Sequence, residues 1–175
     1  PPAFQGVEEV RRRIKEAVIF DALERGRLTP QELTDRLTAA LDLRVTPGEF
    51  RALWASIFLP ETLVPEEMLE RLHARCRMLL LSNTDRIHFD FVRGRYPILR
   101  HMDDFVVSFE VGMRKPEPGI YQEAIRRAGC PPTEIFFTDD LAANVEGARA
   151  AGIDAVRFTS ADQMEDELRA RGIVW

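Results

Sequence analysis

The strongest constraint on the fold is a regular alternation of short apolar runs with helical segments over residues 66–175. The apolar runs have the length of buried strands, and they lie at 78–81, 105–107, 135–137 and 155–158. The segments with helical character lie at 66–75, 84–94, 117–129, 141–151 and 161–171. Strands and helices that alternate in this way form a parallel sheet with helices on both faces. The sequence therefore predicts the α/β class, with a Rossmann-like sheet.

The first third of the chain has a different pattern, because apolar residues recur near the helical period over residues 7–23. Thr29-Pro30-Gln31-Glu32 and Thr46-Pro47-Gly48-Glu49 then combine an N-cap threonine, a proline in the first turn and a following glutamate. This combination is typical of a capping box at the start of a helix. Ser160 with Gln163 predicts a similar box for the last helix. The first third is therefore expected to be a small bundle of short helices.

The two patterns divide the chain into a helical domain over residues 1–65 and an α/β core domain over residues 66–175. Charged residues make up 30% of the chain and the formal net charge is −5, which argues against a nucleic-acid-binding surface. No apolar run approaches the ~20 residues that a membrane-spanning helix needs. Cys76 and Cys130 form no CxxC motif, as is typical of idle thiols in a reducing compartment. We expect a cytoplasmic protein, monomeric or homodimeric.

Polar side chains follow two of the predicted strands, at the edge where parallel sheets bind their ligands. Ser82 and Asn83 follow the first strand, where they can hold an anion at a helix start or serve only as helix caps. Asp139 and Asp140 follow the third strand. Adjacent carboxylates repel each other unless a cation compensates them, and Mg²⁺ takes one or two carboxylates with phosphate and water. The alternative is that Asp140 only caps the next helix.

A lysine lies between these two strand ends in the sequence, in the loop 112–118. A lysine in such a loop is by itself most often a surface residue. Lys115 becomes a candidate site residue only because of the other motifs in the sequence. The segments Leu81–Thr84, Lys115-Pro116 and Phe137–Asp140 occur in this order on successive strand ends. Together they resemble the second, third and fourth motifs of the haloacid dehalogenase superfamily.

The resemblance is closer to one subgroup, the sugar-phosphate phosphatases typified by bacterial α-glucose-1-phosphate phosphatase, to which the phosphatase domain of soluble epoxide hydrolases is related. The residues that carry it are Ser82–His88, Gly112–Glu117, Ile120-Tyr121, Asp139-Asp140 and Asn144. In the helical domain, Glu24–Thr29 resembles the cap helices of the same subgroup. The resemblance therefore covers nearly the whole chain, and it implies that residues 1–65 are a cap on an α/β core.

The resemblance implies a Mg²⁺-dependent phosphatase that hydrolyses a small phosphorylated metabolite, such as a sugar phosphate, through an aspartyl-phosphate. Ser82 matches the residue that hydrogen-bonds the transferring phosphoryl group, and Asn83 matches a substrate contact. Lys115 matches the lysine that neutralises charge on the phosphoryl group and on the nucleophile. Asp140 matches the main magnesium ligand, with Asp139 as a nearby or second ligand. These roles suit phosphoryl transfer, which depends on positioning and charge neutralisation.

The chain departs from the family in one respect, because the sequence contains no Asp-x-Asp, the first motif that carries the nucleophile and the general acid/base. The segment 17–21 imitates the apolar strand before that motif, but Leu23 stands where the acid/base should be. The helical period also runs through Asp21, so Asp21 is predicted not to be the nucleophile. We expect a segment of roughly 20–30 residues, one strand and its loop, ahead of Pro1. Without it the core lacks its first strand and the chain should be inactive.

Two other functions remain open. The chain is either a truncated, non-catalytic binding protein with this fold, or a haloacid dehalogenase. The second alternative needs no magnesium, so the Asp139-Asp140 pair argues against it.

Overall fold

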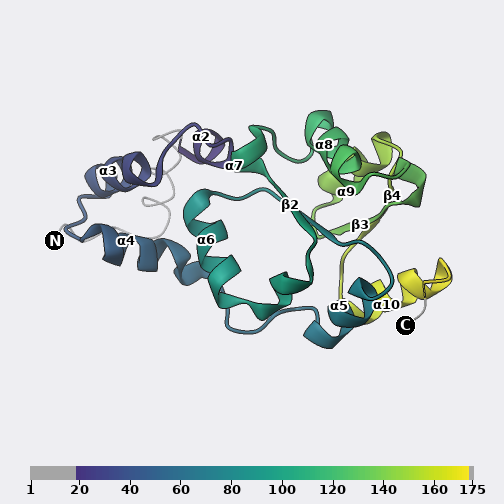
Figure 1. The fold of residues 1–175 in the computed structure, drawn as a ribbon. Helices are drawn as coiled ribbons and strands as arrows, with labels where there is room; N and C mark the ends of the chain where they lie inside the picture. The colour runs from purple at the N-terminus through teal and green to yellow at the C-terminus, as the bar shows by residue number, and fades with distance from the viewer. Residues whose placement is uncertain (1–18, 174–175) are drawn as a thin grey trace.

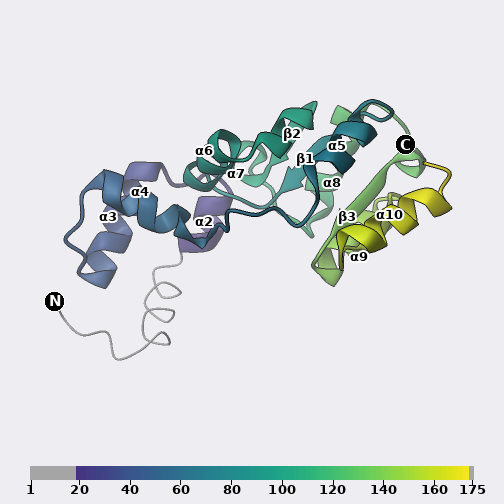
Figure 2. The same ribbon diagram turned by 90° about the horizontal axis from the view of Figure 1, so that it is seen from below.

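The computed structural model describes residues 19–173 (Figure 1). In chain order the elements are α2 (Ile19–Glu24), α3 (Pro30–Leu41), α4 (Pro47–Trp54), η1 (Ala55–Ile57), α5 (Glu66–His73), β1 (Leu79–Ser82), α6 (Arg86–Arg95), η2 (Pro97–His101), β2 (Asp104–Val107), α7 (Ser108–Val111), α8 (Pro118–Ala128), η3 (Pro132–Glu134), β3 (Phe136–Asp139), α9 (Ala142–Ala150), β4 (Asp154–Arg157) and α10 (Ala161–Ala170). Helices α2–α4 lie at one end of the molecule and β3, β4 and α9 at the other (Figures 1 and 2). No helix within residues 19–173 is long and apolar enough to cross a membrane.

The predicted parallel strands are present, and they form two separate pairs. β1 pairs with β2 in parallel, with Leu81 opposite Val106. β3 pairs with β4 in parallel, with Phe137 opposite Ala155. Within the described residues no ladder joins the two pairs. The α/β prediction is confirmed, and the interruption between the pairs is the arrangement expected of a core that lacks its first strand.

The burial of the strands follows from this interruption. Val106 and Val107 of β2 are fully buried, whereas all four residues of β1 are only half-buried. In β3, too, Phe136, Phe137 and Thr138 are half-buried. The apolar run at 78–81 was predicted to be a buried strand, and that prediction is wrong in its burial because β1 is covered by β2 on only one edge.

The capping boxes predicted at Thr29 and Thr46 are confirmed. The Thr29 hydroxyl accepts from Glu32 N at 3.2 Å, and the Glu32 carboxylate accepts from Thr29 N at 2.8 Å. The box at Thr46 has the same two bonds. Local hydrogen bonding therefore sets where α3 and α4 begin. The predicted box at the last helix is wrong in one half, and the helical segment predicted ahead of Ile19 lies outside the described residues.

At the last helix, Ser160 is the N-cap, and its hydroxyl accepts from Gln163 N at 3.1 Å. The return bond goes elsewhere, because the Gln163 side chain accepts from Thr159 N at 3.2 Å. The glutamine side chain reaches one residue further back than a capping box requires, so the backbone N–H of Ser160 is not its partner.

Each part of the molecule has its own apolar core. In the helical part, Ile19, Leu33, Leu37 and Phe50 pack together, and Ile87 of α6 joins them. In the α/β part the largest cluster is formed by Val106, Ile120, Tyr121, Val145, Ala148, Ile153 and Ala155. Because Ile87 belongs to α6, the core of the helical part extends onto the α/β part.

The two parts also approach closely at the end of α2. Gly26 has a positive φ of +67°, and a Cβ atom at this position would lie 2.0 Å from the carbonyl oxygen of Phe109 in α7. Only a residue without a side chain can therefore occupy this position without displacing α7. The contact sets the distance between the helical part and α7, the short helix that follows β2.

Candidate functional site

Lys115 lies at the centre of the candidate site. Its side chain is only 9% exposed, and its ammonium group lies 2.6 Å from a carboxylate oxygen of Asp139 at the end of β3. The same group donates to the carbonyl oxygen of Leu81 in β1 at 2.8 Å. One cation therefore connects the carboxyl ends of the two strand pairs. The interpretation of Lys115 as a surface lysine is wrong.

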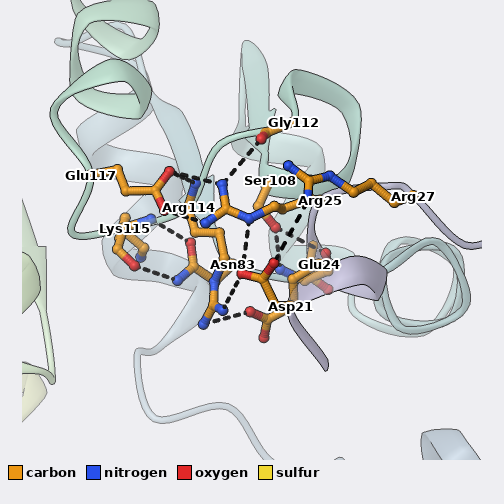
Figure 3. A network of polar contacts seen from close by, with 11 residues as sticks. Asp21, Glu24, Arg25, Arg27, Asn83, Ser108, Gly112, Arg114, Lys115 and Glu117 are labelled. Carbon is orange, nitrogen blue, oxygen red and sulfur yellow. Dashed lines mark hydrogen bonds and ion pairs between the residues drawn. The ribbon is translucent and has the colours of Figure 1, made fainter. Parts of the chain in front are cut away.

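Asn83 holds the backbone of Lys115 (Figure 3). Its side-chain Nδ2 donates to the carbonyl oxygen of Lys115 at 2.9 Å, and its Oδ1 accepts from Lys115 N at 2.8 Å. Both polar atoms of the amide are thus bound to the loop that carries the lysine. The sequence predicted a substrate contact for Asn83, and that role stays a prediction, whereas the structure gives the side chain a positioning role.

Ser82 ends β1, directly before this loop contact, and it lines the pocket described below. Its hydroxyl has one long contact, at 3.5 Å to the carbonyl oxygen of Asn83. The following turn is fixed by Ser108, which is fully buried. The Ser108 hydroxyl accepts from Thr84 N at 2.9 Å and donates to the carbonyl oxygen of Thr84 at 3.0 Å. No sequence motif marks Ser108, although its place directly after a strand is a signal.

Asp139 and Asp140 occupy different environments. Asp139 is buried, and its Oδ1 accepts from Leu141 N and from the Asn144 side chain, each at 2.9 Å. Burial alone would raise the pKa of Asp139, but the bond from Lys115 and these two donors hold it below its ordinary value. Asp140 is exposed. The N-cap of α9 is Leu141, and no side chain makes a capping hydrogen bond there. The alternative that Asp140 caps this helix is therefore wrong.

The two carboxylates differ in how well they fit a magnesium ion. Asp140 offers an exposed oxygen ligand at a strand end, and a site of one or two carboxylates completed by phosphate and water is the ordinary form for Mg²⁺. Both oxygens of Asp139 already accept from protein donors, which suits it less to be a second ligand. Within residues 19–173 no group of three His, Cys, Asp or Glu side chains could hold a metal by itself.

Asp21 lies in α2 and not at the end of a strand. Its carboxylate accepts from Arg25 at 2.8 Å and from Arg114 at 3.2 Å. The hydrogen bond from Arg25, with a smaller contribution from Arg114, holds the pKa of Asp21 below its ordinary value. This environment agrees with the prediction that Asp21 is not the nucleophile.

A network of ion pairs connects α2 to the loop that carries Lys115 (Figure 3). The Arg25 guanidinium donates to both carboxylate oxygens of Glu117, at 3.0 Å for the Nη1 bond. Arg114 in turn lies 2.8 Å from Glu24 of α2. These long-range pairs had no sequence signal. They place the helical part directly beside the lysine loop.

A pocket of about 520 Å³ lies between the two parts. Trp54 and Phe58 of the helical part line one side, and Ser82, Asn83 and His88 line the other. Most of the remaining lining is apolar, and it comes mainly from α2, η1, β1, α6 and η2. The pocket therefore opens beside the residues predicted to bind a phosphoryl group, and it can hold a small organic group next to them.

The family model for haloacid dehalogenase-like hydrolases matches residues 5–152 of this chain. The chain belongs to the haloacid dehalogenase-like hydrolases. The sequence resemblance to this superfamily is therefore confirmed, and the match extends over both the helical part and most of the α/β part.

Relatives in this family include D-ribitol-5-phosphate phosphatase from Bacteroides thetaiotaomicron, which is 24% identical over 156 residues, 86% of this chain and 76% of that protein. Bifunctional epoxide hydrolase 2 from Rattus norvegicus is 39% identical over 54 residues, 31% of this chain and only 10% of that protein. A solved structure of a haloacid dehalogenase family enzyme from B. thetaiotaomicron, in complex with magnesium and inorganic phosphate, has a TM-score of 0.77 at 28% identity. The match covers 85% of this chain and 80% of that one.

Proposed function

We propose that this protein is a magnesium-dependent phosphomonoester hydrolase that acts on a small phosphorylated metabolite. The observation that carries the proposal is the buried Lys115 ammonium, which contacts Leu81 at the end of β1 and Asp139 at the end of β3. Phosphoryl transfer needs positioning and charge neutralisation more than covalent chemistry from many groups. A fixed cation at the carboxyl ends of parallel strands meets that need.

Each residue of the site has a role in this proposal. Ser82 donates a hydrogen bond to the phosphoryl group, and Lys115 neutralises the negative charge that gathers on it in the transition state. Asp139 and Asn83 hold Lys115 in place, one by its ammonium group and the other by its backbone. Asp140 would hold a magnesium ion, which supplies further charge neutralisation at the phosphoryl group when bound.

The proposed reaction proceeds through an aspartyl-phosphate. A carboxylate attacks phosphorus, the bond to the leaving oxygen breaks, and water then hydrolyses the acyl phosphate to inorganic phosphate. We place this carboxylate in an Asp-x-Asp segment that precedes Pro1. Two facts support this placement: the 175 residues contain no Asp-x-Asp, and no ladder joins β1 to β3 in the described residues.

The proposed substrate class is a sugar or polyol phosphate. One relative is named for its action on D-ribitol 5-phosphate, and the pocket beside Ser82 has a volume of about 520 Å³. Pockets of roughly 300–1,000 Å³ are typical of small-molecule sites. The carboxylate of Glu24, which also lines the pocket, is available to accept hydrogen bonds from the hydroxyl groups of a substrate.

The test is an assay of the protein that carries its Asp-x-Asp segment against a panel of sugar, polyol and aromatic phosphates, with and without Mg²⁺. Release of inorganic phosphate that requires Mg²⁺ supports the proposal. Release of halide from 2-haloacids without Mg²⁺ would instead make the protein a dehalogenase. Substrate binding without turnover would favour the non-catalytic binding protein.

A further inference from the structure

A histidine lies between the helical part and the α/β part, and both of its ring nitrogens face hydrogen-bond acceptors. Nδ1 of His88 lies 2.9 Å from Oδ2 of Asp85, and Nε2 lies 2.9 Å from the carbonyl oxygen of Trp54. A backbone carbonyl and an ionised carboxylate can only accept, so each nitrogen must carry a proton to make its bond. The geometry therefore requires the doubly protonated imidazolium form of His88.

Asp85 is ionised in this arrangement. Its side chain is 3% exposed, and its Oδ1 accepts from the backbone N–H groups of Ile87 at 2.8 Å and His88 at 3.0 Å. Its Oδ2 also accepts from the indole Nε1 of Trp54 at 3.1 Å. Burial alone would raise the pKa of Asp85, but the bonds from His88 and Trp54 hold it below its ordinary value. Each of these hydrogen-bond partners, together with His88 Nδ1, is a donor to the carboxylate.

The surroundings of His88 also favour a positive charge. The indole ring of Trp54 stacks on the imidazole, with 5.2 Å between ring centroids and 7° between planes, an arrangement that attracts a cation to the aromatic face. Glu24 of α2 is a second negatively charged group that acts on His88. Arg114 lies 2.8 Å from the Glu24 carboxylate. Burial by itself lowers the pKa of His88. The opposing effects of Asp85, the Trp54 carbonyl and Glu24 are larger, so the pKa lies above its ordinary value.

The histidine connects elements that border the site. Trp54 ends α4 in the helical part. Asp85 is the N-cap of α6 and His88 lies in its first turn, a few residues after Ser82 and Asn83. All five residues line the pocket. The charged contact therefore fixes the wall of the pocket that belongs to the helical part against the wall that carries the predicted phosphoryl contacts.

We propose that His88, as an imidazolium bound to both Asp85 and the Trp54 carbonyl, is a positioning residue that holds the helical part closed over the pocket. Loss of one proton leaves a single N–H, so one of the two bonds must break and Trp54 is held less firmly. The effect of His88 on turnover rests on the proposed function. The effect of His88 on the contact between the two parts does not.

The sign of the pH dependence follows from the raised pKa. A histidine whose pKa is higher in the folded protein stabilises it fully below the unfolded value, ~6.5. That contribution is lost as the pH rises through the folded value. The contact should therefore be complete in mildly acidic solution and weaken in alkaline solution.

The first experiment is an NMR titration of the three histidines in the 175-residue chain, with the indole N–H of Trp54 as a second probe. We expect His88 to titrate above the ordinary histidine pKa of ~6.5 and the Trp54 indole signal to move with the same midpoint. His73 is a matched control, because its Nε2 also faces a carboxylate, that of Asp103, at 3.1 Å. Titration of His88 at or below the ordinary value, or an indole signal independent of it, would overturn the proposal.

The second experiment uses turnover in the active protein. We expect His88→Gln to raise KM about tenfold, the effect of losing one charge-assisted hydrogen bond, with a smaller change in kcat. We also expect the KM of the unmodified enzyme to rise in alkaline solution, and this rise should be absent in the variant. His73→Gln should leave both KM and its pH profile unchanged. An unchanged KM in His88→Gln would contradict the positioning role, whereas inactivity of every form would count against the proposed function and leave the NMR result to decide this one.

Discussion

At the scale of single residues, the site depends on one buried ion pair. Lys115 and Asp139 are 9% and 6% exposed in their side chains, so neither charge has water to replace its partner. Removing one member of such a pair costs more than the pair itself contributes, because the other charge stays buried without compensation. The same lysine is thus both a structural partner and the proposed catalytic cation.

Replacing Lys115 by alanine should therefore affect both stability and turnover. We expect about 3–5 kcal/mol less free energy of unfolding, because Asp139 is left uncompensated, and a fall in kcat of roughly 10²–10³ from the lost electrostatic donor. Urea unfolding and phosphate release measure the two effects. In the double variant Lys115→Ala/Asp139→Asn much of the stability should return while the activity should not. Activity within about threefold of the unmodified enzyme would contradict the catalytic role.

The pH dependence of this stability difference has a definite sign. The pKa of Asp139 is lower in the folded protein than its ordinary value. Its contribution is therefore present above the unfolded pKa of ~3.9 and is lost as the pH falls through the folded value. We expect the difference in unfolding free energy between the unmodified chain and Lys115→Ala to shrink in acid. A difference that grows as the pH falls would contradict the assignment.

At the scale of elements, the end of α2 controls how the helical part sits on the α/β part. The Arg25–Glu117 pair joins them by charge, and Gly26 joins them by close contact with Phe109. The ion pair is partly exposed and contributes little by itself. The backbone contact is the more specific constraint, since it requires both a positive φ and the absence of a side chain.

Gly26→Ala should accordingly destabilise the chain by at least about 2 kcal/mol, because the left-handed conformation alone costs alanine roughly 1–2 kcal/mol and its Cβ atom meets the Phe109 carbonyl. Gly94→Ala is the matched control. Gly94 lies in α6 and a Cβ atom there meets nothing within 4 Å, so alanine should stabilise by up to about 1 kcal/mol. Equal effects of the two substitutions on the urea midpoint would show that the contact with α7 is unimportant.

The elements themselves were predictable from the sequence, because their signals are local. The apolar runs located each strand within about two residues, and the threonine boxes located the starts of α3 and α4. The contacts that build the site are not local. Asn83 holds a backbone 32 positions away, and Arg25 reaches Glu117 across 92 positions. No periodicity encodes such pairs, so the motif residues could be predicted from the sequence but the network that positions them could not.

At the scale of the whole molecule, the described residues include the proposed phosphoryl contacts, but none of the aspartates near them is placed as a nucleophile. Asp139 is bound to Lys115, and Asp21 is bound to Arg25 and Arg114 in a helix. Asp140 is the exposed carboxylate that fits a cation. We therefore expect the residues that bind the phosphoryl group and the magnesium ion to come from one segment of the protein, and the carboxylate that attacks phosphorus to come from another.

The 175-residue chain should then show no phosphatase activity at any Mg²⁺ concentration. Hydrolysis of p-nitrophenyl phosphate, followed by absorbance, measures this directly. The control is Asp21→Asn, because Asp21 follows an apolar run that imitates the strand before the family's nucleophile. Magnesium-dependent hydrolysis that this substitution abolishes would restore Asp21 as the nucleophile and would contradict its assignment to the cap.

The most direct test of the whole account is the magnesium dependence of phosphate release by the protein that carries its Asp-x-Asp segment, compared with its Asp140→Asn variant. We predict a saturable requirement for Mg²⁺ in the unmodified protein and no magnesium-dependent turnover in the variant. Because Asp140 is exposed, the unfolding free energy should change by no more than about 0.5 kcal/mol. Equal magnesium dependence in both proteins would contradict the proposed site.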